Sequence, residues 1–214
     1  MSWSLNEIEG LARKATRGAG LSWGLAEDAG RATRWLCAMG LPAADELANV
    51  LTEIDGVAYT EIAPQSFDNP WRAPGGTLCP LVAGACLTDM AGALADGEPI
   101  TLGRTAHPLL LYPYLAAAAD MTGTSLALEW DGTTITRADA TSFLDSDGPD
   151  TPVTEKVRAG IAGAPTGRPA RRAWRGEISA DTAQILQGLA HRTYAPETEQ
   201  SRLAGAGAGL TDND

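Results

Sequence analysis

Apolar residues recur at spacings of three and four along the first quarter of the chain, which is the pattern of amphipathic helices. Ser4 and Glu7 have the spacing of a capping box, in which each side chain accepts a hydrogen bond from the backbone N–H of the other residue. Ser22 is placed to cap a second helix, and Pro42 is placed to open a third. Residues 1–56 are therefore predicted to form a three-helix unit.

A run without Asp, Glu, Lys or Arg begins at His107 and continues to Ala119. We expect this run to lie in the interior and to organise the core. Pro113 has no backbone N–H and disfavours helical geometry at the residue before it. The pattern therefore predicts an extended segment up to Tyr112 and a helix that begins at Pro113. Gly123 is expected to end this helix.

The pattern changes to alternation between Leu126 and Trp130, which indicates a half-buried strand. Asp131-Gly132 follows, and this dipeptide favours the two-residue type I′ turn of a β-hairpin. Such a turn fixes the register and places Leu128 opposite Ile135. One face of the predicted hairpin is apolar, so other elements must cover it.

The remaining signals are shorter. They predict a strand at Tyr59–Ile62, an irregular segment from Pro64 to Pro80, a helix at Leu81–Leu94, strands at Ile100–Leu102 and Val153–Val157, and a helix capped by Ser179. The whole pattern predicts an α+β fold in which the N-terminal three-helix unit packs with a small, mainly antiparallel sheet and further helices. We expect a single domain over residues 1–204, divided into the helical unit and a mixed part at 57–204, and a flexible Gly/Ala-rich C-terminal arm at 205–214.

Composition and charge exclude several classes of function. The chain has 214 residues and a net charge of −11, which argues against a nucleic-acid or anionic-membrane surface. The amino terminus lacks the pattern of a signal peptide, and no apolar run reaches the roughly 18 residues of a membrane span, so we expect a cytoplasmic protein. The three cysteines are too few and too oddly spaced for a disulfide scaffold or a zinc site, so free thiols and no metal are predicted.

A glycine pattern near the carboxyl end could be mistaken for a nucleotide site. Gly205, Gly207 and Gly209 are spaced like part of a dinucleotide fingerprint, but only five residues follow them. That fingerprint must open a helix whose N-terminus receives the pyrophosphate. We therefore predict no cofactor.

His107 and Cys79 are the candidates for catalysis. His107 is one of two histidines and opens the uncharged run, where it is suited either to general acid–base work or to a hydrogen-bonded structural role. Cys79 lies just ahead of a predicted helix, whose N-terminal dipole would lower the pKa of the thiol and activate it as a nucleophile. The alternative for Cys79 is an inert buried thiol. His191 falls in the last turn of a predicted helix, where the dipole favours a structural role.

Candidates for substrate binding come from the segment Phe67–Pro80 and from two other places in the chain. Long irregular segments are often functional. The candidates are Trp71, Arg72, Tyr112 and Arg202.

A basic cluster lies further along the chain and consists of Arg168, Arg171, Arg172 and Arg175. These arginines either pair with a carboxylate or phosphate, or form a charged strand edge that resists aggregation. The acidic end of the 205–214 arm is expected to dock beside Arg72, Arg171 or Arg172.

The stretches Ser4–Glu9 and Gly18–Glu27 and the ending Gly205–Asp214 together resemble a family of bacterial proteins of unknown function. The likeness spans most of the chain and implies no catalytic residues. The first 40 residues are also similar to the N-terminal helices of the malate and L-lactate dehydrogenase family that lacks a Rossmann fold. No active-site motif of that family follows, so we attribute the second similarity to a shared helix pair.

Two functions fit these patterns. The first is an accessory subunit or partner-binding protein of a metabolic enzyme, whose Trp-bearing segment and arm dock on another protein or on a second copy of the chain. The second is a small-molecule enzyme with a site around Phe67–Pro80 and His107. The scarcity of histidine and the absence of a strong motif favour binding. An aromatic segment with Gly75-Gly76, a thiol and a nearby histidine favours a site.

Overall fold

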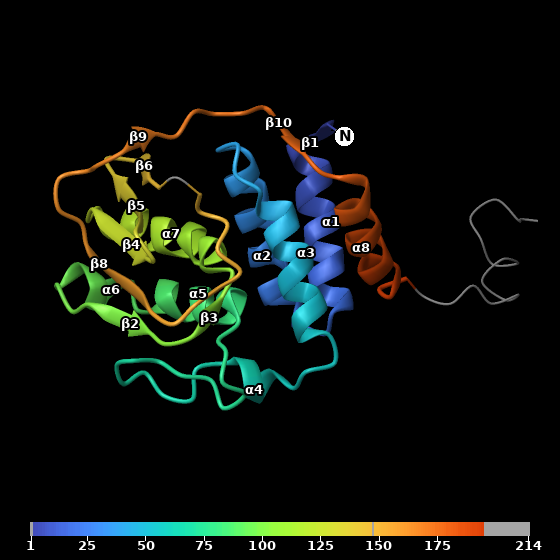
Figure 1. Ribbon diagram of the computed structural model, residues 1–214, viewed down its shortest axis with the longest axis horizontal. Helices are drawn as coiled ribbons and strands as arrows, with labels where there is room; N and C mark the ends of the chain where they lie inside the picture. Colours follow the sequence, from blue (N-terminus) through green and yellow to red (C-terminus); the bar gives the residue numbers. More distant parts are fainter. Residues whose placement is uncertain (1, 147, 195–214) are drawn as a thin grey trace, which may run out of the picture.

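The protein is described by a computed structural model over residues 2–146 and 148–194. Figure 1 shows two regions side by side, a bundle of helices on the right and a sheet with its covering helices on the left. The N-terminal helices precede the six-stranded sheet, and every pairing between named strands is antiparallel. The predicted α+β class is therefore confirmed.

The helical region begins with α1 (Leu5–Gly18), α2 (Trp23–Cys37) and α3 (Ala43–Ile54). Both hydrogen bonds of the predicted capping box are present at the start of α1, at 2.8 and 3.2 Å. The C-terminal helix α8 (Ala180–His191) packs against α1 and α3. The predicted three-helix unit is confirmed, and a fourth helix from the far end of the chain completes it.

The large sheet has six strands in the order β2-β8-β4-β5-β6-β9. The strands are β2 (Ile100–Leu102), β4 (Leu126–Trp130), β5 (Thr133–Ala138), β6 (Thr141–Asp145), β8 (Val157–Ile161) and β9 (Arg168–Pro169). Leu128 pairs with Ile135, and both residues of the Asp131-Gly132 turn have positive φ angles. The predicted hairpin and its register are confirmed.

Three helices belong to the sheet region, namely α5 (Pro80–Asp89), α6 (Ala91–Ala95) and α7 (Tyr112–Thr122), and α5 packs against α7. The helix α7 packs on β4 and β5 and ends at Gly123, as predicted, while α6 packs on β8. Two small sheets pair β1 (Ser2–Ser4) with β10 (Arg175–Glu177) and β3 (Thr105–Ala106) with β7 (Val153–Thr154). One cluster of buried apolar residues extends from the bundle into the sheet region. No helix among the described residues is long and apolar enough to cross a membrane.

Two predictions of local structure are wrong. Tyr59–Ile62 is a short helix, α4, because the backbone N–H of Ala63 bonds to the carbonyl of Tyr59 and not to a neighbouring strand. Pro108–Leu111 is a 3₁₀ helix, η1, and not an extended segment. All four of its residues are buried, and Tyr112 adopts helical angles despite the following proline. Core packing thus overrides the local preference imposed by Pro113.

Two predicted elements are each divided in the structure. The predicted helix Leu81–Leu94 is interrupted at Met90 and forms α5 and α6. The predicted strand Val153–Val157 becomes β7 and the first residue of β8, which belong to different sheets. The sequence pattern locates both regions but does not reveal the change of direction inside each.

Candidate functional site

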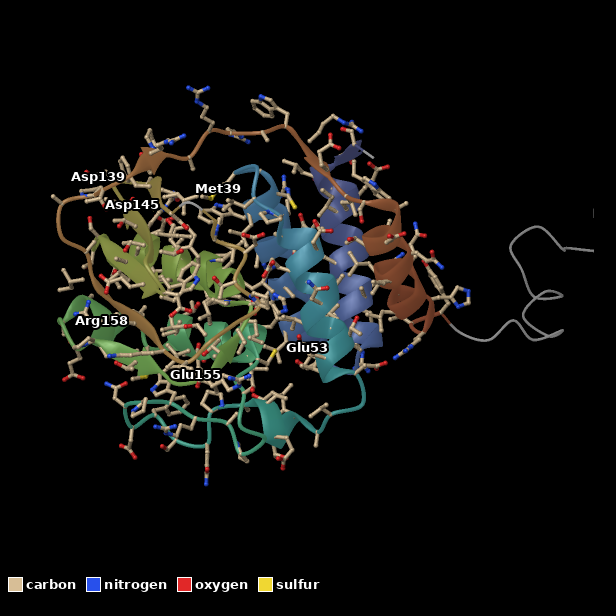
Figure 2. All side chains as sticks on the ribbon, in the orientation of Figure 1. Met39, Glu53, Asp139, Asp145, Glu155 and Arg158 are labelled. Carbon is tan, nitrogen blue, oxygen red and sulfur yellow. The ribbon has the colours of Figure 1, made fainter. Side chains whose placement is uncertain are left out.

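A pocket of about 390 Å³ lies between α3, the 57–79 segment and the β3/β7 pair. Its volume is within the range of small-ligand sites. The walls are mainly aliphatic, and three charged side chains line it, those of Glu53, Glu61 and Arg104. We call it the Glu53 pocket. In Figure 2, Glu53 lies near the end of α3, on the side of the bundle that carries the 57–79 segment.

A row of three ionisable groups leads from the interior to this pocket. Glu46 and His107 are both buried, with 5% and 2% of their surface exposed. The imidazole Nδ1–H of His107 donates to Glu46 Oε2 at 2.6 Å, and His107 Nε2 lies 3.6 Å from Glu53 Oε1. The Glu53 side chain is 54% exposed and lines the pocket. The histidine therefore connects a buried carboxylate to one that faces the ligand space.

The two carboxylates decide the charge of His107. Burial by itself lowers the pKa of the imidazole, but the hydrogen bond to Glu46 and the charges of Glu46 and Glu53 outweigh it and raise the pKa above its ordinary value. Within the described chain, the buried Nε2 atom has no hydrogen-bond partner. The two carboxylates therefore favour the charged form of His107, and its Nε2 atom faces Glu53.

His107 also has an uncommon backbone conformation. Its φ of 42° and ψ of 60° lie in the left-handed region, which non-glycine residues seldom adopt. The conformation is held by hydrogen bonds from the His107 N–H to the Pro152 carbonyl and from the Leu110 N–H to the His107 carbonyl. Strained residues of this kind persist where the surroundings over-determine them, and they cluster at functional sites.

Cys79 lines the Glu53 pocket at the residue that precedes α5. Its backbone N–H donates to the Ile62 carbonyl, and its side chain is almost fully buried. Burial raises the pKa of the thiol to about 11, opposite to the lowering expected from the helix dipole. Little thiolate therefore exists at neutral pH, and the geometry favours the buried-thiol alternative for Cys79.

Arg104 supplies the basic wall of the pocket. Its Nε–H donates to Thr77 Oγ1 at 3.1 Å, and its guanidinium pairs with Glu155. Glu61, which also lines the pocket, is exposed. No set of three or more His, Cys, Asp or Glu side chains among the described residues has the arrangement of a metal site. The carboxylates and the guanidinium of this pocket can take part in proton transfer and charge recognition.

The substrate-binding candidates among the described residues do not gather at this pocket. Trp71 is fully buried, and its indole N–H donates to the Phe67 carbonyl. Tyr112 is fully buried as well, and its hydroxyl donates to the Thr136 carbonyl. Arg72 is exposed and is not among the described residues that line the Glu53 pocket. Arg202 and the 205–214 arm lie outside the described residues.

The sequence reasoning missed Glu46 and Glu53. Both lie on α3 seven residues apart, on the stripe that also carries Val50. Residues at i, i+4 and i+7 share one face of a helix. Carboxylates on an otherwise apolar face are therefore the signal that could have marked them.

Residues 3–79 match the model of a family described as a protein of unknown function (DUF3726). The predicted resemblance to a family of unknown function is confirmed for this part of the chain, which holds Glu46, Glu53 and Cys79 but not His107. No curated protein matches the sequence.

Proposed function

We propose that the protein is an enzyme that acts on a small organic molecule in the Glu53 pocket, with Glu53 as the group that exchanges a proton with it. His107 and Glu46 are positioning residues in this proposal. The observation that carries it is the position of the His107 imidazole between a buried carboxylate and a carboxylate that lines the pocket. Clusters of coupled ionisable groups beside a pocket are characteristic of acid–base sites.

The geometry supports proton transfer in both directions. Glu53 faces the ligand space, so its carboxylate is placed to accept a proton from a bound molecule. The Nε2–H of His107 lies behind it, and a small rotation of the half-exposed Glu53 side chain would shorten their 3.6 Å separation to a hydrogen bond. Glu46 keeps the imidazole oriented and charged. A proton acceptor and a proton donor therefore meet at one wall of the pocket.

The partner-binding hypothesis has weaker support. It relied on an aromatic segment that presents Trp71 to another protein and on the 205–214 arm. Trp71 has no exposed surface, and the arm lies outside the described residues. Phe67 is the aromatic residue of that segment that remains exposed.

The test compares two carboxylates of the same pocket. The native protein is incubated in D₂O with panels of amino acids, 2-oxo acids, 2-hydroxy acids and amides. Mass spectrometry then detects deuterium uptake at carbon or new products. Glu53→Gln keeps the shape of the side chain and should lower the rate by about 100-fold or more, the usual contribution of a general acid or base. Glu61→Gln, which also lines the pocket, should have a much smaller effect.

Equal turnover by wild type and Glu53→Gln would refute the role of Glu53. Absence of turnover across the panels, together with a Glu53→Gln protein that unfolds at a lower temperature than wild type, would assign the three ionisable groups to stability alone.

A further inference from the structure

A second pocket, of about 670 Å³, lies where α2, the β5–β6 hairpin and the segment after β9 meet. We call it the arginine pocket. Met39 is one of its lining residues and lies beyond the end of α2 in Figure 2. The segment that connects β9 to β10 passes above Met39 in this view. The five arginines that line it are Arg31, Arg34, Arg137, Arg171 and Arg172. No Asp or Glu is found among the described residues of its lining.

This concentration of positive charge is unusual for the chain. The protein carries 16 Lys and Arg against 27 Asp and Glu, yet five of the 16 line one pocket. A guanidinium stays charged at every physiological pH, so the group cannot relieve its mutual repulsion by losing protons. A bound anion would relieve it.

Three of the five arginines are paired with carboxylates that do not line the pocket. Arg31 pairs with Asp28 at 2.6 Å and Arg34 with Glu9 at 3.2 Å. Arg137 pairs with Asp120 through two hydrogen bonds of 2.9 and 2.8 Å. These contacts fix the three guanidiniums and neutralise them in part.

Arg171 and Arg172 have no carboxylate partner within the described part of the chain. Arg172 lies over the exposed ring of Trp174, which contributes no negative charge. Three of the five guanidiniums thus have a carboxylate partner, and those of Arg171 and Arg172 have none among the described residues. Its electrostatics therefore suit a ligand with two or more negative charges.

The wall of the pocket is already ordered around Arg137. The guanidinium of Arg137 donates to Ser142 Oγ at 3.3 Å and lies 5.7 Å from the Trp35 ring centroid, and its side chain is 13% exposed. Two of its five N–H groups remain for a ligand. Thr141 and Ser142 bring hydroxyl groups to the lining, and Trp35 and Met39 bring apolar surface. A charged end and a small uncharged body can both be accommodated.

We propose that the arginine pocket binds a small organic oxyanion of charge −2 or more, held by Arg171 and Arg172 against the fixed guanidinium of Arg137. A phosphate and a di- or tricarboxylate share this chemistry. A volume of about 670 Å³ suits a small molecule, whereas the net negative charge of the whole protein opposes a nucleic acid. The site is separate from the Glu53 pocket and does not depend on the enzymatic proposal.

The test uses inorganic pyrophosphate and citrate, with acetate as a monovalent reference, on the full chain at constant ionic strength. Calorimetry measures affinity, and the backbone amide signals of Ala140 and Ser142 report the place of binding. Pyrophosphate or citrate should bind, and acetate should not. Arg171→Gln/Arg172→Gln should weaken binding by tenfold or more, as expected when hydrogen bonds to charged groups are lost.

A matched control removes two positive charges elsewhere. Arg158→Gln/Arg192→Gln changes two exposed arginines that pair with Glu129 and Asp55, outside the arginine pocket. In Figure 2, Arg158 lies on the opposite side of the sheet region from Met39. The affinity of this variant for pyrophosphate and citrate, like that of Glu53→Gln, should be within about twofold of the wild-type affinity. A tighter complex with pyrophosphate than with citrate would identify the ligand class as a phosphate, and the reverse order as a polycarboxylate.

Two results would overturn the proposal. One is the absence of binding by both polyanions at millimolar concentration. The other is an equal loss of affinity in the two double variants, which would show that the loss follows from the change in net charge and not from the arginine pocket.

Discussion

The Glu53 pocket and the arginine pocket both contain several charged side chains, but they differ in how those side chains are buried and paired. Behind the Glu53 pocket, His107 is buried with a carboxylate on either side. In the arginine pocket four of the five arginines are exposed, and two of the five have no carboxylate partner among the described residues. A buried charge is stable only when it is paired, whereas water can solvate an unpaired one at the surface. The stability of the fold at the first pocket is therefore sensitive to the loss of either partner of His107. The second pocket can remain stable without a ligand.

The largest expected effect follows from removing a buried partner. Glu46→Ala should lower the free energy of unfolding by about 3–5 kcal/mol, because it leaves His107 buried without its carboxylate. Urea denaturation at pH 6 measures the change. Arg34→Ala, at the arginine pocket, removes a half-exposed ion pair with Glu9 and should cost within about 1 kcal/mol. Equal losses in the two variants would erase the contrast between the pockets.

The second effect is a pH dependence that only the Glu53 pocket should show. The pKa of His107 is raised in the folded protein, so its charged form stabilises the fold most fully below the pKa of the unfolded chain. That contribution should fall as the pH rises from the unfolded pKa through the folded one. The thiols of Cys37 and Cys79, whose pKa values burial raises to about 11, stay protonated over this range.

The titration of His107 can be followed by NMR of the histidine ring signals. The chain has two histidines, and His191 is exposed, so the signal of the buried His107 can be told apart. Glu46→Gln keeps a hydrogen-bond acceptor but removes the charge, so it should lower the pKa of His107 and flatten the dependence of unfolding on pH. An unchanged titration of His107 in this variant would show that Glu46 does not set its charge.

Local signals in the sequence predicted most elements of the fold. The capping box at Ser4 and the Asp131-Gly132 turn depend on residues within a few positions of each other, so their structure could be inferred directly. The strand predicted at Tyr59–Ile62 was wrong because a segment of four residues with mixed propensities takes the structure that its surroundings impose. The packing of α8 against α1 also lay beyond local signals, since it joins the two ends of the chain.

The sites depend even more on distant contacts. His107 was identified from its type and position, but its partner Glu46 lies 61 residues earlier, and no local pattern connects them. Arg171 and Arg172 were recognised as part of a basic cluster, while Arg31, Arg34 and Arg137 reach the same pocket from α2 and β5. Side-chain types could therefore be proposed from sequence, but not the sets in which they act.

The smallest expected effect concerns the turn that borders the arginine pocket. Ala140 lines this pocket with a φ of 57°, and Gly132 takes a φ of 77° in the neighbouring hairpin turn. Left-handed geometry strains alanine but not glycine, although glycine loses more backbone entropy on folding. Ala140→Gly should therefore stabilise the protein by only about 0.5 kcal/mol, while Gly132→Ala, whose new Cβ would meet no atom within 4 Å, should destabilise it by about 1 kcal/mol. Paired urea titrations measure both changes, and a loss of stability in Ala140→Gly would mean that the alanine methyl group packs in the pocket strongly enough to outweigh its strain.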